Sequence, residues 1–450
     1  MSRLDTDVCI IGGGPAGSAA ARRLLSLGYR VCIVERGRAS PRVESIAPSI
    51  MPALAALELE AVVARCGFLR CEGTRVLWQG ATPSERAAAT LLIDRAQFDR
   101  HALCAAADAG SRIVLGDART RTRSSAGWRV AVDSAHGALA VEAAYLVDAR
   151  GRDPKHRALG VPTAAICGRW RVGHPQGMRV EALADAWLWG APVADGSYYV
   201  AVFLDMHACA GLRRSAREAL YRSRIEESRL LRFCARGELI GALAVRNATC
   251  GMAEDVVSKS SIKIGDRVLA MDPLSSQGLQ AALRSALHAS AVIHTILSNG
   301  DADAALAFYG DSIQRAAANH RRATQEIYAS QGRHGSTFWR SRSARAQSGA
   351  QAPRTVADRN AALRLCPQAC VAEHPVVEGD LIARHPALSH PSLEQPVAWL
   401  SGVALTPLLR TLDVARAPAE ILASWSRHVG PRAAQRILDW LVDRGVVVGA

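Results

Sequence analysis

Apolar residues recur at two different spacings in the first half of the chain. Residues 7–11, DVCII, form a short apolar run, and a second run, RVCIVE, ends at Glu35. Between them, SAAARRLLSLG has helical spacing, so the order strand, helix, strand is predicted at the N-terminus. Short alternating runs within 156–264, such as SYYVAVFLDM, predict an antiparallel sheet, because successive side chains of a strand face opposite sides.

The second half of the chain has mostly helical patterns. DPLSSQGLQAALRSALHAS opens a long amphipathic helix, and another helical section runs from Asp301 to about Tyr328. After a linker rich in Arg, Ser and Ala, three helices are expected within 397–444, followed by the strand-like GVVV. The last of these helices carries one apolar stripe, formed by Ile437, Leu438, Leu441 and Val442.

Three glycines stand where the first predicted strand meets the first helix. Gly12, Gly14 and Gly17 follow the strand directly. In such a unit the glycines allow a tight turn, a close backbone approach to a pyrophosphate and tight helix–strand packing, and the helix N-terminus attracts phosphate. Glu35 ends the second strand, where a carboxylate would accept hydrogen bonds from a ribose. The arrangement predicts a dinucleotide-binding unit, and both NAD and FAD fit it.

Elements further along the chain distinguish between these two cofactors. Gly265-Asp266 precedes the strand RVLAM, and Asp272-Pro273 with Gly278 opens the next helix; LLIDRAQFDRHAL and YLVDARGRD lie upstream. In this order the pieces resemble the FAD-binding elements of aromatic-hydroxylase-like flavoproteins over residues 1–340. The resemblance implies that Asp266 approaches the ribityl or phosphate part of FAD and that 273–278 faces the isoalloxazine. The expected cofactor-binding residues are Gly12, Gly14, Ala16, Gly17, Glu35, Arg36, Arg95, Asp266, Pro273, Ser276 and Gly278.

The expected fold is α/β, with a Rossmann-like FAD-binding domain of the aromatic-hydroxylase type, an inserted β-sheet substrate domain and a small C-terminal winged-helix-like domain. No second glycine triplet follows a strand, so electrons are expected from NAD(P)H bound transiently or from a partner reductase. The expected divisions are 1–155 with 265–300 for FAD, 156–264 for the substrate sheet, 301–340 for a helical segment, 341–370 for a linker and 371–450 for the last domain.

Residues 187–192, WLWGAP, match the Trp-x-Trp-x-x-Pro signature of tryptophan halogenases. VESIAP at 43–48 resembles their Gly-Glu-x-x-x-Pro loop, with valine in place of the glycine. Those enzymes rely on an early lysine and on a glutamate in an Asp-Pro-Leu-Glu-Ser loop. Here the first lysine is Lys155, only Arg70 and Arg75 stand near the expected position, and Ser275 replaces the glutamate. Arginine stays protonated and forms a haloamine poorly, so the sequence disfavours halogenation.

Direct oxygen transfer from O2 to an electron-rich ring is the simplest chemistry left for such a flavin. The protein would exclude water and position the ring. Trp187, Trp189 and Pro192 are then expected to line the substrate pocket, although two core tryptophans on one strand face would show the same spacing.

No catalytic acid or base follows from spacing alone. Glu44 and Arg42 are the candidates, with His174 and Asp195 as further possibilities, and each of these residue types is more often structural. An indole attacked by an electrophilic oxygen does not require a strong base.

An aromatic pattern in the later helical region narrows the resemblance. It consists of Phe308, Tyr309, Tyr328, Phe338, Trp339 and Arg340. It resembles the pattern of QhpG-like flavoproteins, which mature tryptophylquinone enzymes. The resemblance implies hydroxylation of a tryptophan within a peptide or small protein, such as a quinohemoprotein amine dehydrogenase small subunit, during biogenesis of the tryptophylquinone (CTQ) cofactor. Another maturation enzyme is a further candidate partner.

Three alternatives stay open from the sequence: a hydroxylase of a free small aromatic metabolite, a tryptophan halogenase, and a non-catalytic flavoprotein chaperone. The last 80 residues loosely resemble peptide-recognition domains to which a leader peptide adds as a strand. They contain seven arginines, no lysine and eight acidic residues, which does not suit a nucleic-acid surface despite the net charge of +14 for the chain.

Composition adds expectations about location and metals. No apolar run approaches the roughly 20 residues of a membrane helix, and the N-terminus lacks a signal peptide, so a cytoplasmic protein without a membrane partner is expected. The eleven cysteines contain no Cys-x-x-Cys, which predicts reduced, buried thiols. No metal site is expected, because His374, His385 and His390 lack a metal-binding spacing with cysteine.

Overall fold

The computed structural model describes residues 2–37, 42–124, 127–173, 177–343 and 362–450. The chain divides into two compact units. The first contains Met1–Ile293 and His320–Arg345, and the second contains His294–Asn319 and Ala346–Ala450. Among the described residues, no helix combines the length and apolarity needed to cross a membrane. The greater part of the linker expected at 341–370, namely 344–361, and the candidate His174 lie outside the described residues.

A seven-stranded sheet forms the nucleotide-binding part of the first unit. The predicted strand–helix–strand order is confirmed, and β1 pairs in parallel with both β2 and β8. Parallel pairing requires crossovers such as α1, whereas β6, β7 and β8 form an antiparallel meander. The strands are β1 Ser2–Ile11, β2 Val31–Glu35, β6 Arg112–Ser124, β7 Gly127–Ser134, β8 Gly137–Asp148, β16 Val257–Ser258 and β17 Ser261–Lys263.

An eight-stranded sheet forms the second layer, in the order β14-β10-β13-β12-β11-β4-β5-β3. It joins three strands from before residue 95 to strands from 163–247, so the sheet expected within 156–264 also contains strands from the N-terminal range. The domain boundaries themselves stay a prediction. Its strands are β3 Val43–Ile46, β4 Phe68–Leu77, β5 Ser84–Asp94, β10 Thr163–Arg171, β11 Met178–Ala182, β12 Ala186–Pro192, β13 Tyr198–Asp205 and β14 Glu238–Asn247. A small third sheet contains β9 Arg157–Ala158, β15 Gly251–Met252 and β18 Leu269–Ala270.

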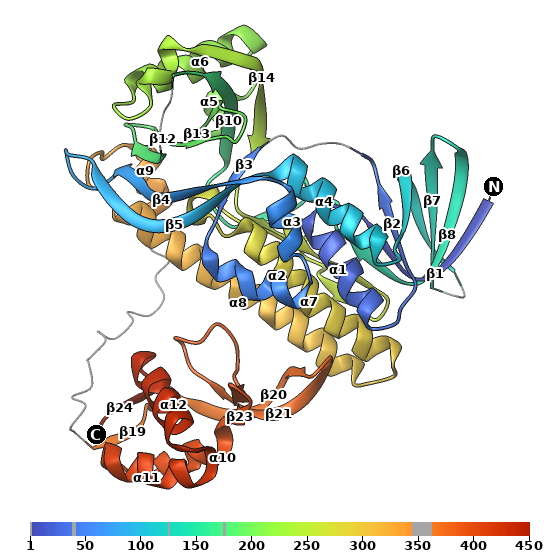
Figure 1. The fold of residues 1–450 in the computed structure, drawn as a ribbon, viewed down its shortest axis with the longest axis vertical. Helices are drawn as coiled ribbons and strands as arrows, with labels where there is room; N and C mark the ends of the chain where they lie inside the picture. The colour runs from blue at the N-terminus through green and yellow to red at the C-terminus, as the bar shows by residue number, and fades with distance from the viewer. Residues whose placement is uncertain (1, 38–41, 125–126, 174–176, 344–361) are drawn as a thin grey trace. The chain divides into compact units, whose positions relative to one another are not determined.

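Helices cover these sheets. Helix α1 begins with Pro15 and packs against α4, β1 and β2 (Figure 1). The Asp94 carboxylate caps α4 by accepting hydrogen bonds from the backbone N–H groups of Ala96 and Gln97. The helices are α1 Pro15–Ser26, α2 Met51–Ala56, α3 Glu60–Arg65, α4 Arg95–Asp108, α5 Met206–Cys209, α6 Arg214–Glu227, α7 Gly278–Leu297, α8 Ala302–Ala329 and α9 Thr337–Ser343. The helical section expected from Asp301 to Tyr328 is therefore confirmed.

The two faces of the eight-stranded sheet have separate cores. Tyr198, Val200 and Val202 point to one face, where Tyr221 and Ile225 of α6 cover them. Tyr199, Ala201 and Phe203 point to the other face, together with aromatic residues from α8 and α9. This alternation is the period-two pattern that predicted the strands. Eight of the eleven cysteines are buried, as the cysteine pattern predicts, whereas Cys104 and Cys370 are exposed and Cys366 is partly buried.

The second unit contains the three predicted C-terminal helices and the closing strand. Three residues of the predicted stripe, Ile437, Leu438 and Leu441, are buried around Trp425, while Val442 is partly buried against the same cluster. The elements are β19 Leu363–Leu365, β20 Cys370–Glu378, β21 Leu381–Ser389, β22 Trp399–Leu400, β23 Val403–Ala404, α10 Leu405–Leu409, α11 Pro418–Val429, α12 Pro431–Asp443 and β24 Val447–Gly449. Strands β19 and β24 pair, and β20 and β21 form a hairpin.

Candidate functional site

The glycine loop connects β1 to α1 in a conformation that needs its glycines. Gly12 has φ +108°, a region that other residues rarely adopt. A Cβ on Gly17 would lie 1.9 Å from the Gly12 carbonyl oxygen, whereas a Cβ on Gly14 would meet nothing within 4 Å. Gly12 and Gly17 therefore allow close packing, and Gly14 borders open space at the N-terminus of α1. That open space suits a pyrophosphate approaching the backbone.

The carboxylate of Glu35 faces this loop. Its Oε2 accepts a hydrogen bond of 2.5 Å from the Gly13 N–H, and its Oε1 accepts one of 3.0 Å from the Gly37 N–H. The neighbouring Arg36 points instead toward Asp117, with 3.7 Å between its guanidinium and that carboxylate. Glu35 is thus placed beside the glycine loop, and a contact between Arg36 and the cofactor stays a prediction.

The second predicted element meets the glycine loop directly. A Cβ on Gly265 would lie 2.8 Å from the Cβ of Ala16, in the first turn of α1. The Gly265 N–H also donates to Ser285 Oγ of α7, at 2.8 Å. Asp266 is therefore held beside the start of α1, although 249 residues separate it from Gly17 in the chain.

Arg152 is a residue that the motif analysis missed. Burial lowers the pKa of its guanidinium, and the charge of Asp266 opposes this effect. Arg152 donates to the Thr249 carbonyl oxygen, and none of the described carboxylates forms an ion pair with it. A partly buried positive charge without an ion-pair partner suits an anionic group. The open space at Gly14 and this guanidinium together fit a dinucleotide such as FAD. The second arginine of YLVDARGRD was the available signal in the sequence.

The loop formed by residues 272–276, called here the flavin loop, connects β18 to α7. Asp272 caps its short 3-10 turn by accepting a hydrogen bond from the Leu274 N–H, and Ser276 has φ +52°. Ser276 Oγ lies 3.2 Å from Ser45 Oγ. Ser45 of VESIAP and Ser276 of DPLSSQG are 231 residues apart in the chain, and the two motifs are therefore in contact.

Tyr328 of α8 joins the flavin loop to the tryptophan motif. Its hydroxyl donates to Asp272 Oδ2 at 3.1 Å. Burial raises the pKa of the Asp272 carboxyl even though part of that side chain stays accessible. Tyr328 belongs to the same buried core cluster as Trp187, whose indole N–H forms no hydrogen bond with any described group.

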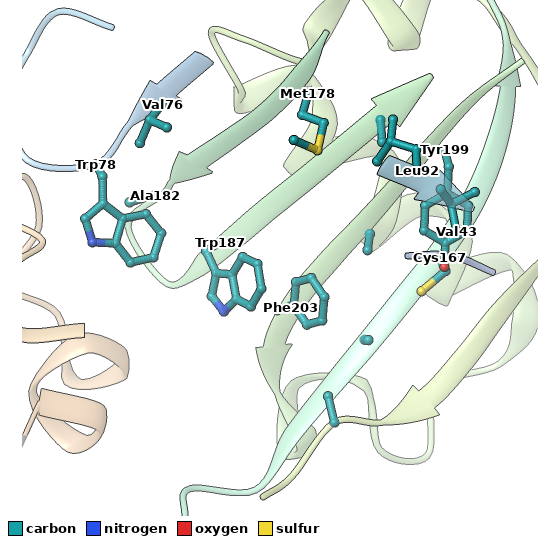
Figure 2. Packing of buried hydrophobic residues seen from close by; sticks show 14 of the residues in the cluster. Val43, Val76, Trp78, Leu92, Cys167, Met178, Ala182, Trp187, Tyr199 and Phe203 are labelled. Carbon is teal, nitrogen blue, oxygen red and sulfur yellow. The ribbon is translucent and has the colours of Figure 1, made fainter. Parts of the chain in front are cut away.

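An aromatic cluster, comprising Trp78, Trp187, Phe203, Tyr328, Phe338 and Trp339, forms a wall beside this contact. Trp187 stacks on Phe203, and Trp78 lies edge-on to Trp187 (Figure 2). The Trp187 and Phe203 ring centroids are 3.8 Å apart, and Trp78 also lies edge-on to Trp339. Trp189 points to the same sheet face, is only partly buried, and packs against Tyr199. Of the two tryptophans in WLWGAP, Trp187 is thus a core residue and Trp189 is more accessible.

A cleft of about 470 Å³ opens beside the same sheet. Val43, Leu92 and Pro192 supply apolar lining. At its rim Arg169 bridges Asp94 and Asp195, at 2.6 and 2.9 Å. Val43 and Leu92 also belong to the core cluster that contains Trp187. Pro192 lines this cleft, while Trp187 and Trp189 do not.

The acid–base candidates lie in ion-pair networks. Arg95 contacts Glu44 at 2.6 Å and Asp99 at 3.0 Å, and Arg42 contacts Glu44 at 2.8 Å. Burial alone would raise the pKa of Glu44, but the charges of Arg95 and Arg42 outweigh it and lower the pKa to about 2. Glu44 is therefore an ionised structural carboxylate at neutral pH. The guanidinium of Arg95 is occupied by carboxylates, so its predicted contact with FAD stays a prediction.

Asp195 is likewise ionised. Burial would raise its pKa, but hydrogen bonds from Ser197 and the charge of Arg169 lower it. Neither Glu44 nor Asp195 can therefore act as a proton donor at neutral pH.

A Glu44→Gln variant is expected to lose about 3 kcal/mol of unfolding free energy at neutral pH. Because the folded pKa of about 2 lies below the ordinary value of 4.5, this contribution is complete above pH 4.5 and disappears as the pH falls toward 2. Urea unfolding of both proteins across this range measures it. Glu238→Gln, which removes an exposed pair with Arg171, should cost less than about 1 kcal/mol. A pH-independent difference for Glu44→Gln would contradict the assignment.

The aromatic residues predicted between 308 and 340 do not form one site. Tyr328, Phe338 and Trp339 join the cluster described above, whereas Phe308 and Tyr309 belong to the second unit. Arg340 is exposed and donates to the Thr337 hydroxyl at 3.2 Å. Trp78 of the aromatic cluster and His320 of α8 also belong to this region. Neither residue was part of a motif in the sequence.

Comparison with known proteins agrees with this geometry. A family model described as an FAD binding domain matches residues 5–67. The chain is 30% identical to LodB of Marinomonas mediterranea, named as an FAD-dependent oxidoreductase, over 63% of this chain and 83% of LodB. The structure of QhpG, a peptidyl tryptophan dihydroxylase essential for tryptophylquinone cofactor biogenesis, superimposes with a TM-score of 0.78 at 28% identity, covering 98% of this chain and 100% of QhpG. The flavin-dependent halogenase CmlS shares the fold, with a TM-score of 0.80 at 20% identity over 99% of this chain and 96% of CmlS.

The fold and the glycine-loop site define a flavin-dependent oxidising enzyme with the FAD-binding fold of aromatic hydroxylases and halogenases. The chain belongs to the family of FAD-dependent oxidoreductases that includes LodB. The predicted α/β fold class and the expected FAD cofactor are thereby confirmed.

Proposed function

We propose that this enzyme is an FAD-dependent monooxygenase that hydroxylates a tryptophan within a peptide or small protein during tryptophylquinone cofactor biogenesis. The observation that carries the proposal is the position of Tyr328: its hydroxyl donates to Asp272 of the flavin loop, and its ring packs in the buried aromatic cluster that contains Trp187. The likeness to QhpG along the whole chain, at 28% identity, supports the same substrate class.

The chain's own groups would hold the cofactor and exclude water. Gly14, Arg152 and the N-terminus of α1 would hold the pyrophosphate, Glu35 the ribose, and the flavin loop would border the isoalloxazine. Bound FAD, once reduced, supplies oxygen-transfer chemistry with O2. We infer that electrons come from NAD(P)H or a partner reductase. The aromatic cluster would keep water from this side of the site, because its side chains are buried and mostly apolar.

The cleft at Pro192 suits an aromatic side chain carried by a larger molecule. It opens to solvent, and its lining combines apolar residues such as Val43, Leu92 and Pro192 with charged groups that can meet a polypeptide backbone. An enclosed pocket would instead favour a free metabolite.

Halogenation has less support from the chain. Arg75 is exposed and pairs with Glu85, and Ser275 Oγ donates to the Asp272 carbonyl oxygen. Neither group can replace the lysine or the glutamate on which the tryptophan halogenases rely.

The substrate class is tested by comparing free tryptophan with tryptophan held in a polypeptide. The full chain is supplied with FAD, a chemical reductant, air, and either L-tryptophan or a quinohemoprotein amine dehydrogenase small subunit. We expect oxygen to be added only to the polypeptide, as seen by mass spectrometry of its tryptic peptides. Oxygen added to free tryptophan alone would favour the metabolite hydroxylase. Flavin binding without any product would favour the non-catalytic chaperone.

A further inference from the structure

Helix α8 holds Asp272, the first residue of the flavin loop, at two points. The Asp272 N–H donates to Nε2 of His320 at 2.8 Å, and the Asp272 carboxylate accepts from the Tyr328 hydroxyl. These two residues are eight positions apart, about two helical turns, and so lie on the same side of α8. Thr324 lies between them and donates to the His320 carbonyl oxygen. A single rigid helix face therefore fixes both the backbone and the side chain of Asp272.

The roles of donor and acceptor in this arrangement are fixed by burial. His320 must present a lone pair at Nε2, so its proton is on Nδ1, for which no described group serves as a partner. Burial lowers the pKa of His320 to about 4, so the ring stays neutral. Burial raises the pKa of Tyr328 well above its usual value, so the phenol stays a donor. Neither contact changes direction near neutral pH.

Tyr328 also faces the substrate wall. Its ring lies 6.1 Å from that of Trp339, and Trp187 belongs to the same buried cluster. At the other end of the flavin loop, Ser276 meets Ser45. The loop is thus fixed between α8 and β3, and Tyr328 contacts both the loop and the aromatic cluster.

We propose that His320 and Tyr328 are positioning residues: together they fix Asp272 and the flavin loop, and Tyr328 couples packing at the Trp187 wall to that loop. The proposal rests on the proposed function only in placing the loop beside the flavin. Neither residue is required to touch the substrate or to transfer a proton.

Hydrogen exchange on the full chain with bound FAD tests this role. In Tyr328→Phe, which removes only the hydroxyl, the amides of Leu274 and Ser275 should exchange about tenfold faster, the effect of losing one hydrogen bond to a charged group. The matched control is Tyr221→Phe. It also removes a buried hydroxyl, which donates to the Val200 carbonyl oxygen on the opposite sheet face. Unchanged loop exchange in Tyr328→Phe, or an equal increase in Tyr221→Phe, would overturn the proposal.

A pair of His320 variants gives a second readout. His320→Leu removes the acceptor for the Asp272 N–H, while His320→Gln retains an oxygen that can accept. We expect the leucine variant to shift the midpoint potential of bound FAD and to speed loop exchange, and the glutamine variant to restore most of both. Identical behaviour of the two variants would overturn the positioning role. Both readouts are taken without substrate, so they stay informative if the hydroxylation proposal fails.

Discussion

Gly17→Ala is expected to purify without flavin and with a marked loss of stability. The added Cβ would lie 1.9 Å from the Gly12 carbonyl oxygen, so the turn between β1 and α1 must open. Forced overpacking of this kind costs about 3 kcal/mol, and it also displaces the backbone that approaches the pyrophosphate. Flavin absorbance per mole of protein and urea unfolding measure the two effects.

Gly14→Ala separates cofactor binding from folding at the same loop. A Cβ at this position meets nothing within 4 Å, and its backbone has an ordinary φ of −70°. The unfolding free energy of the apoprotein should therefore change by less than about 0.5 kcal/mol. The affinity for FAD should fall at least about tenfold, because the methyl group occupies space where the phosphates approach.

Gly335→Ala is the matched control for this loop, because it also adds a methyl group where nothing lies within 4 Å. It should leave FAD affinity unchanged. Wild-type flavin content in Gly17→Ala, or wild-type affinity in Gly14→Ala, would show that the cofactor does not lie on this loop.

Arg95→Leu is expected to lower the unfolding free energy by about 3–5 kcal/mol. The Arg95 side chain is 6% exposed and pairs with both Glu44 and Asp99, so its removal leaves two carboxylates in a largely buried place. Arg42 can still neutralise Glu44, which leaves Asp99 as the more destabilising charge. Urea unfolding at neutral pH measures the loss.

Two further proteins test the cause of that loss. Adding Glu44→Gln and Asp99→Asn to Arg95→Leu should recover part of the stability, because the unpaired charges are then gone. Arg119→Leu removes an exposed pair with Asp133 and should leave the free energy of unfolding nearly unchanged. If neutralising the carboxylates recovers nothing, the effect of Arg95 comes from its packing alone.

The local parts of the fold could be predicted from the sequence because their signals are local. The glycine loop and its flanking strands follow each other within 35 residues, and hydrophobic periodicity alone located the helix that ends near Tyr328. The apolar stripe around Leu438 located the last helix in the same way.

The strand pairings of the substrate sheet could not be predicted in this way. Strand β4 pairs with β11, and so joins segments about 100 residues apart, for which period-two spacing carries no information about partners. Strands β3, β4 and β5 of this sheet therefore lie outside the range 156–264 in which the sheet is expected. Its edge strand β3 brings Ser45 to the flavin loop, a contact that the motif spacing did not contain.

The sequence predicted the separate motifs of the site but not the tertiary contacts between them. Trp187 and the DPLSSQG motif were both identified, but the link between them through Tyr328 depends on tertiary packing. Arg95 and Glu44 were assigned separate roles in the sequence, whereas they neutralise each other. Charge pairing across the fold decides the pKa of such groups, and residue type alone does not.

The most direct test of the account uses ¹⁸O2 and bromide together. The full chain with FAD and a reductant is incubated with a small-subunit polypeptide that contains tryptophan, and the polypeptide is analysed by mass spectrometry. We expect one or more tryptophans to gain oxygen carrying the ¹⁸O label and no bromine to be added. A brominated tryptophan, or a polypeptide without labelled oxygen although the flavin is reoxidised, would contradict the proposed hydroxylation.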